Sequence, residues 1–153
     1  ITVRECTFAG NQLGVSIGTR DCYNAIEACR IEDNRGPGVL VRPAPRPTEV
    51  HSVRVQRCRI ANNARSEGRA QVEITSDAHA LIVTENEISG VVGDLKPAIY
   101  AEESTRDLYL VGNLGLEGEF GVQAAAGCLV EDAPEIETGY GEWSTEIFRH
   151  LPC

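Results

Sequence analysis

The chain has 153 residues, and 14 lysines and arginines against 23 aspartates and glutamates give it a formal net charge of −9. This charge argues against a nucleic-acid partner, because phosphate binding needs a basic surface. No apolar run is long enough to span a membrane, so membrane insertion is not expected. Methionine is absent and aromatic residues make up 5% of the chain, so valine, isoleucine and leucine must form most of the interior of a single domain.

From its first residues the sequence repeats a short pattern. An apolar residue is followed three positions later by cysteine and then by another apolar residue, around Cys6, Cys29 and Cys58. Asparagine takes the cysteine position at Asn86 and Asn113, and the successive steps are 23, 29, 28 and 27 residues. A repeat of this length with short, alternating, β-branched segments predicts one solenoid turn per repeat.

Further short strands are predicted within each repeat, separated by turn residues. Those that follow the cysteine or asparagine segment are GVSIG (14–18), GVLVR (38–42), QVEIT (71–75), AIYAE (98–102) and GVQAA (121–125). Those that precede it are clearest as VHSVRV (50–55), HALIV (79–83) and RDLYLV (106–111). Helical periodicity is nearly absent, so the chain is predicted to be all-β.

The spacing of the repeats selects among the known solenoids. The steps vary, which excludes the strict hexapeptide period of a left-handed β-helix, and the leucine-rich-repeat signature is missing. A right-handed parallel β-helix of about five coils remains. We expect β-helix repeats over residues 1–129 and a non-repeating C-terminal cap over residues 130–153.

The combined pattern VxIxxCxIxxNxxxGVxI resembles the right-handed β-helix repeat of pectate lyases, polygalacturonases, alginate lyases and related carbohydrate-active proteins. The resemblance covers roughly residues 1–127. It implies that Asn11, Asn34 and Asn63 point inward and hydrogen-bond the backbone of adjacent coils. It also implies that a sugar ligand lies along the sheet formed by the GVxI strands.

The catalytic motifs of these families are mostly missing. The NTD, DD, GHG and RIK motifs of polygalacturonases and the Asp-His strand motif of pectate lyases do not occur. Alginate-lyase-like members need only a lysine or arginine pair with Ca²⁺, and this looser requirement stays open. We therefore assign no catalytic residue and expect a carbohydrate-associated module of an exported protein, secreted or periplasmic, that binds or scaffolds on a polysaccharide. The alternatives are a polysaccharide lyase or glycoside hydrolase that acts on the GVxI face, and a structural stalk or adhesin without a ligand.

The candidate substrate-binding residues lie on or near the GVxI strands. The outward residues of these strands are predicted to be Ser16, Leu40, Glu73, Tyr100 and Gln123. Tyr100 is expected to stack on a sugar ring, and Arg69 and Lys96 to contact a uronate. Glu73 and Glu102 are expected to hold a cation such as Ca²⁺ or to act as a base. The alternative is a solvated face of mixed charge.

A second candidate site precedes the cysteine-containing segments. Counting back four residues from the apolar residue that opens each copy gives Cys22, His51 and His79, followed by Arg106. If these residues stack at one corner, a thiolate and two imidazoles form a ligand set for zinc or copper. The alternative is a row of ordinary polar turn residues.

The cysteines outside this second candidate site are expected to have structural roles. Cys6, Cys29 and Cys58 are expected mid-strand as stacked core thiols, with a disulfide or a metal site as alternatives. Cys128 and Cys153 are candidates for a bridge between the last coil and the tail.

In the tail, Trp143, Ile147, Phe148 and Leu151 are expected to cover the last coil, the alternative being an acidic interaction segment. Because Ile1 starts within a strand, an upstream domain of a longer protein or self-association is expected at that edge.

Overall fold

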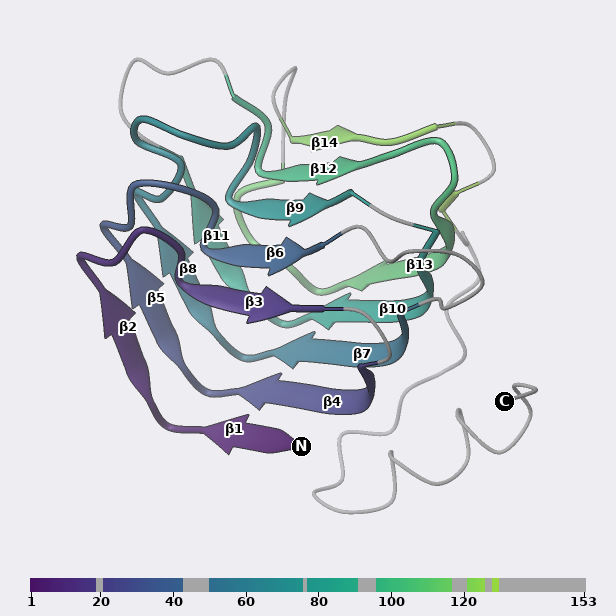
Figure 1. The fold of residues 1–153 in the computed structure, drawn as a ribbon, viewed down its shortest axis with the longest axis horizontal. Helices are drawn as coiled ribbons and strands as arrows, with labels where there is room; N and C mark the ends of the chain where they lie inside the picture. Colours follow the sequence, from purple (N-terminus) through teal and green to yellow (C-terminus); the bar gives the residue numbers. More distant parts are fainter. Residues whose placement is uncertain are drawn as a thin grey trace.

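The chain winds into a solenoid of short strands (Figure 1). The computed structural model describes residues 1–18, 21–42, 50–75, 77–90, 96–116, 121–125 and 128–129. The strands of the first two coils are β1 (Thr2–Arg4), β2 (Thr7–Ala9), β3 (Val15–Ile17), β4 (Cys22–Glu27), β5 (Arg30–Glu32) and β6 (Val39–Val41). Those of the next two are β7 (His51–Gln56), β8 (Arg59–Ala61), β9 (Val72–Ile74), β10 (His79–Thr84), β11 (Glu87–Ser89) and β12 (Ile99–Ala101). The fifth coil contains β13 (Arg106–Val111) and β14 (Val122–Gln123).

Three parallel sheets form the walls of the solenoid. Sheet A has the order β1-β4-β7-β10-β13, sheet B the order β11-β8-β5-β2, and sheet C the order β14-β12-β9-β6-β3. In Figure 1 the strands of sheet A point left, those of sheet B point up along the left side, and those of sheet C point right. The predicted all-β fold, a right-handed parallel β-helix of about five coils, is confirmed. None of the described residues forms a helix of the length and apolar character that a membrane crossing requires.

Sharp bends join sheet A to sheet B. The residues at these bends are Glu5, Ala28, Arg57, Glu85 and Gly112, with φ between 50° and 61°. This left-handed conformation costs an ordinary L-residue about 1–2 kcal/mol. Glu5, Ala28, Arg57 and Glu85 are each held by the next coil: the N–H of Ala28, for example, donates to the carbonyl of Gln56 at 3.0 Å. The cysteine or asparagine of each repeat directly follows its bend, so the prediction that the cysteines lie mid-strand was wrong.

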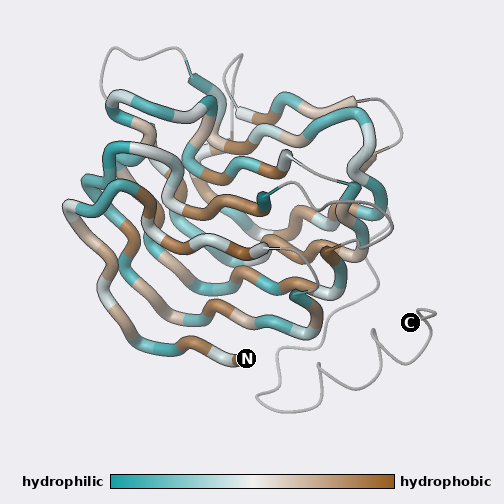
Figure 2. The backbone as a smooth tube through the Cα atoms, viewed as in Figure 1, coloured by the Kyte–Doolittle hydropathy of each residue, from teal (hydrophilic) through white to brown (hydrophobic). Residues whose placement is uncertain are grey.

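The core consists of stacked aliphatic side chains. In sheet B, Phe8, Ile31, Ile60 and Ile88 occupy equivalent positions of successive strands, and the three isoleucines are at most 1% exposed. Each buried isoleucine contributes about 2 kcal/mol of hydrophobic stabilisation. Figure 2 shows the resulting alternation of hydrophobic and hydrophilic segments along the coils. Sheets A and C supply similar columns of valine, isoleucine and leucine to the same interior.

Buried asparagines link neighbouring coils beyond the end of sheet B. The Nδ2 of Asn34 donates to the carbonyl of Phe8 at 3.0 Å, and its Oδ1 accepts the N–H of Asn11 at 2.9 Å. The Oδ1 of Asn63 accepts both the N–H and the Nδ2 of Asn34, at 3.2 and 2.7 Å. Gln71 ends this ladder by accepting the N–H of Asn63 at 2.7 Å and donating to its carbonyl at 2.8 Å. The sequence pattern predicted the asparagines but not the role of Gln71.

A second polar ladder runs through the cysteine positions. The Nδ2 of Asn86 donates to the carbonyl of Val55 at 2.9 Å, and its Oδ1 accepts the N–H of Cys58 at 2.8 Å. The Sγ of Cys58 has comparable partners: it accepts the N–H of Cys29 at 3.5 Å, and its single proton can be donated to the carbonyl of Ile26 at 3.5 Å or to that of Gln56 at 3.3 Å. Burial raises the pKa of Cys58 to about 11, so the thiol keeps the proton that it donates. Cysteine in the first three coils and asparagine in the last two can therefore occupy the same column, because both can donate and accept.

The first coil departs from the expected inward packing. Cys6 and Asn11, in the first described coil, are exposed. Cys29 and Cys58 are buried free thiols, as expected of stacked core cysteines. Cys128 is buried, and Cys153 lies outside the described residues, so the bridge between them stays a prediction. The cap expected over residues 130–153 also lies outside the described residues.

Candidate functional site

The outer face of sheet C carries one column of side chains across all five of its strands. Its members, in order from the first coil to the last, are Ser16, Leu40, Glu73, Tyr100 and Gln123. Their neighbours along each strand, such as Val72 and Ile74 in β9, belong to the core. Side chains alternate between the two faces of a strand, so the column points outward. The structure has the strand register that the sequence predicted for this face.

Arg69, Tyr100 and Glu102 form a cluster on this face. Arg69 precedes β9, and its Nη1 donates to the Tyr100 hydroxyl at 2.8 Å and lies 3.4 Å from Glu102 Oε1. The Cζ of Arg69 is 4.8 Å from the centroid of the Tyr100 ring, within the range of a cation–π contact. The Arg69 side chain is 55% exposed and that of Glu102 is 37% exposed. The cluster is therefore accessible to a ligand from solvent.

The surroundings of Arg69 favour its positively charged form. The Tyr100 hydroxyl makes the largest contribution to raising the pKa of Arg69, and Glu73 and Glu102 add to it against the opposing effect of burial. Both side-chain contacts of Arg69 use Nη1. Its Nη2 and Nε have no hydrogen-bond partner among the described residues. A guanidinium presents these two nitrogens as a fork that fits a carboxylate or a pair of oxygens.

Glu73 is placed differently from the expected cation ligand or base. Its side chain is only 7% exposed, and its Oε2 accepts the backbone N–H of Arg69 at 2.7 Å. The carboxylate thus fixes the turn from which Arg69 extends. Its contribution to the cluster is positional.

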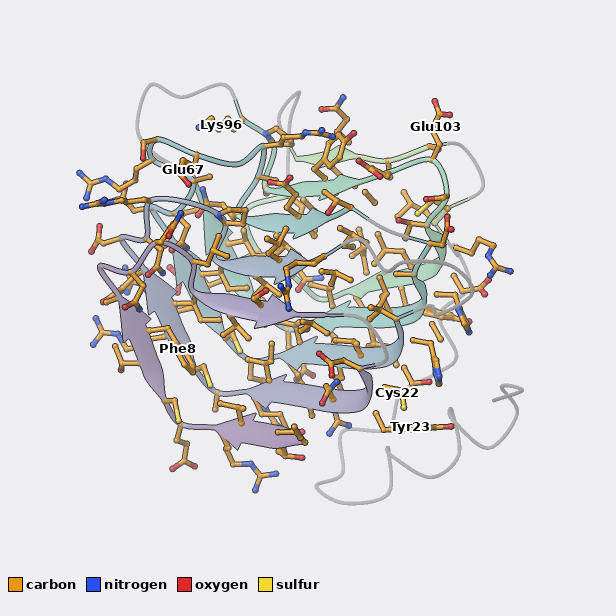
Figure 3. The ribbon with its side chains drawn as sticks, viewed as in Figure 1. Phe8, Cys22, Tyr23, Glu67, Lys96 and Glu103 are labelled. Atoms are coloured by element: carbon orange, nitrogen blue, oxygen red, sulfur yellow. The ribbon has the colours of Figure 1, made fainter. Side chains whose placement is uncertain are left out.

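Lys96 is directed toward a different part of the molecule. Its Nζ donates to the carbonyl oxygen of Ala64, a fully buried residue in the turn after sheet B. In Figure 3 Lys96 lies beyond the start of the sheet C strands, on the opposite side of the view from Glu103. The structure therefore brings together four of the five predicted binding residues and gives Lys96 a backbone contact elsewhere.

The sequence also matches a known family. The family model described as the right-handed β-helix region matches residues 1–114, which is most of the chain. The chain belongs to the right-handed β-helix family. No curated protein and no solved structure matches it. Membership establishes the fold, and because this fold carries many activities, function must be argued from the side chains of this β-helix.

The second predicted site lies at the corner where this β-helix enters sheet A. Cys22, His51, His79 and Arg106 occupy equivalent positions of β4, β7, β10 and β13, as the sequence predicted. The residue after each has a φ between 50° and 55°, which interrupts the strand and keeps this column at the corner. Figure 3 shows Cys22 and Tyr23 at the start of β4.

The two histidines of this corner stack on each other. The ring centroids of His51 and His79 are 5.2 Å apart with an angle of 18° between the planes, and Tyr23 meets His51 edge to face at 5.5 Å. Nitrogen lone pairs lie in the ring plane, so stacked imidazoles do not aim them at one common point. Within the described ranges, no three histidine, cysteine, aspartate or glutamate residues are placed to hold a metal ion. The zinc or copper assignment stays a prediction that this stacking does not favour.

One charged group was not predicted from the sequence. Glu27, at the end of β4, is 3% exposed and pairs with Arg4 at 2.7 Å and with Arg54. Burial alone would raise the pKa of Glu27, but the hydrogen bonds and charges of Arg4 and Arg54 outweigh it and lower the pKa. Arg4 and Glu27 both follow the inward apolar residue of their strand in sheet A. Aligning the repeats on that residue would have placed these opposite charges side by side.

Proposed function

We propose that this β-helix binds a polysaccharide along the outer face of sheet C. The observation that supports the proposal is the exposed cluster of Arg69, Tyr100 and Glu102 on a regular column of outward side chains. Five parallel strands spaced by about 4.8 Å form a flat surface about 19 Å long. An extended polymer of repeating units fits such a surface better than a small compact ligand does.

The three side chains provide complementary contacts for a sugar. Arg69 offers its Nε and Nη2 hydrogens to adjacent ring oxygens or to a uronate, and Glu102 accepts hydrogen bonds from hydroxyl groups. Tyr100 offers apolar ring surface for the C–H groups of a pyranose, although Arg69 covers part of its ring. The cluster combines both charges, so neutral and uronate-containing chains are both candidate ligands.

These residues are better suited to binding a polysaccharide than to catalysing a reaction on it. Glu73 is buried and holds the backbone N–H of Arg69, and an oxygen of Glu102 lies 3.4 Å from the Nη1 of Arg69. A general acid or base needs direct access to the reacting group, and both carboxylates are already engaged by Arg69. The proposed role is therefore that of a secreted or periplasmic protein that attaches to or scaffolds on a polysaccharide.

A glycan array tests the proposal. Wild type is expected to bind one class of polysaccharide, and Tyr100→Ala and Arg69→Ala are expected to lose that signal. Tyr23→Ala is the matched control, because Tyr23 is another exposed tyrosine and lies at the sheet A corner. An array without hits, or hits that survive both substitutions, would contradict the proposal. Release of unsaturated uronates that absorb in the ultraviolet would instead favour a lyase.

A further inference from the structure

Three cysteines form a column at the bends between sheets A and B, at the lower left of Figure 1. The register of β1 with β4 and of β2 with β5 makes Cys6 and Cys29 equivalent residues of adjacent coils. Cys29 and Cys58 are equivalent in the same way. The residue after each buried cysteine binds the coil before it: the N–H of Arg30 donates to the carbonyl of Cys6, and that of Arg59 to the carbonyl of Cys29, both at 2.9 Å. The backbone therefore holds the three cysteines one strand spacing apart.

The three side chains share the same local contact. In each, the Sγ lies within hydrogen-bonding distance of the carbonyl oxygen two residues earlier. The distances are 3.2 Å for Cys6 and Arg4, 3.2 Å for Cys29 and Glu27, and 3.3 Å for Cys58 and Gln56. Side chains that keep one conformation at equivalent positions of neighbouring strands are displaced by the strand spacing, so successive sulfurs lie about 4.8 Å apart.

A sulfur spacing of about 4.8 Å suits a bridging metal ion better than a disulfide. The sulfurs of a disulfide are about 2.05 Å apart, so the two side chains would have to move toward each other. Two metal–sulfur bonds of about 2.3 Å placed in line span about 4.6 Å, which nearly equals the spacing. Thiolates select soft ions such as Cu⁺, and a closed-shell ion of single charge readily takes two ligands in line.

We propose that Cys6 and Cys29 bind one Cu⁺ ion, or the chemically similar Ag⁺, between their sulfurs. Cys6 is exposed, so the ion has access from solvent. The Sγ of Cys29 lies 3.7 Å from the carbonyl oxygen of Val3 and is thus directed toward the coil of Cys6. Cys58 lies one coil deeper and is only 2% exposed, so the site is the pair at the accessible end of the column.

Binding exchanges two protons for the metal ion. Each thiol loses its proton as it forms a metal–sulfur bond, so one bound ion releases two protons. The product carries a single negative charge, from two thiolates and one monovalent cation. Zn²⁺ is not expected to bind here, because it requires four ligands and no three histidine, cysteine, aspartate or glutamate side chains of the described ranges are placed to hold a metal ion.

Cysteine alkylation, measured at each residue by mass spectrometry, tests the site. The reduced full chain is given one equivalent of Cu⁺ in the absence of oxygen, then iodoacetamide, and the modified fraction of each cysteine is measured. Modification of Cys6 is expected to slow about tenfold, because a metal-bound thiolate is no longer free to react. Cys22, a partly exposed thiol at the start of β4, is the internal control and should react equally with and without the ion.

Two substitutions by asparagine distinguish the second ligand from its neighbour in the column. Asparagine already occupies this column at Asn86, so both variants are expected to fold, which circular dichroism verifies. Cys29→Asn removes the second ligand and should abolish the protection of Cys6. Cys58→Asn makes the same change one coil further along and should leave that protection unchanged.

Several results of the alkylation would overturn the proposal. One is equal modification of Cys6 with and without Cu⁺, and another is protection of Cys6 that persists in Cys29→Asn. Equal protection by one equivalent of Zn²⁺ would contradict a two-ligand site. Protection of Cys22 in place of Cys6 would move the ion to the histidine corner.

X-ray absorption at the copper edge gives a second test that needs no substitution. Wild type with one equivalent of Cu⁺ is expected to show two sulfur neighbours around the copper. A third sulfur, or an imidazole nitrogen, among these neighbours would overturn the assignment to Cys6 and Cys29.

Discussion

At the scale of single residues, this solenoid depends on buried polar side chains that hydrogen-bond the backbone of neighbouring coils. Asn34 and Asn63 are fully buried, and their amides contact the preceding coil. A buried donor or acceptor that loses its partner costs about 1–3 kcal/mol. The solenoid therefore needs polar side chains in its interior, because they hydrogen-bond backbone groups near the bends between sheets.

The Cys58 position gives a direct test of this view. Cys58→Asn is expected to keep wild-type stability within about 1 kcal/mol, because asparagine can hydrogen-bond Cys29 and Ile26 as Asn86 does Cys58 and Val55. Cys58→Val is expected to lose about 1–2 kcal/mol, although valine suits a buried site by hydrophobicity alone. Urea unfolding of wild type and the two variants measures the order of their stabilities. A valine variant more stable than the asparagine variant would contradict the account.

The ion pairs of Glu27 predict a pH dependence. Because the pKa of Glu27 in the folded chain lies below its ordinary value of 4.5, the ionised carboxylate stabilises the fold above that value. This contribution is lost as the pH falls through the lowered pKa. Glu27→Gln is expected to reduce the free energy of unfolding by about 3 kcal/mol at pH 7, since it removes the buried negative charge that pairs with Arg4 and Arg54, and the difference from wild type should shrink below pH 4.

The matched control for Glu27 is an exposed pair. Glu32 lies 2.6 Å from Arg30, whose side chain is 62% exposed. Glu32→Gln is therefore expected to cost less than about 1 kcal/mol at either pH. Denaturant unfolding at pH 7 and below pH 4 measures all three proteins. Equal losses for Glu27→Gln and Glu32→Gln at pH 7 would show that the buried pair has no special role.

At the scale of elements, the bends decide where strands end. Most bend residues with positive φ are not glycine, as Ala28 and Arg57 show, so composition alone does not reveal them. The repeat spacing did reveal the strands themselves, because each coil must return to the same register. The bend between sheets A and B was missed, since the cysteine pattern continues across it without a proline or an obligatory glycine.

Gly115 marks a bend that does require glycine. Its φ is 88°, and a Cβ at this position would overlap the carbonyl oxygen of Ile88 in the adjacent coil. Gly115→Ala is expected to destabilise the chain by at least about 2 kcal/mol, because the strain and the overlap add. Gly90→Ala is the control, since a Cβ there meets no atom within 4 Å. Thermal unfolding should separate the two variants, and equal melting temperatures would disprove the role of Gly115.

At the scale of the whole molecule, the repeat explains why parts of the candidate site were predictable. A residue that keeps its place in the repeat stacks on its equivalents, so the column through Glu73 and Tyr100 followed from counting. Arg69 and Lys96 lie between the sheet B and sheet C strands, in segments whose length and sequence differ from coil to coil. The contact of Arg69 with Tyr100 and that of Lys96 with Ala64 depend on those segments, so counting could not distinguish them.

The central claim is that the sheet C face binds a polysaccharide, and calorimetric titration with oligosaccharides of increasing length tests it most directly. The affinity is expected to rise with length until the ligand covers the face, about 19 Å long, and then to level off. Arg69→Ala should weaken binding of the long ligand about tenfold, equivalent to about 1.4 kcal/mol. Affinity that does not depend on ligand length, or that is the same in wild type and Arg69→Ala, would contradict the account.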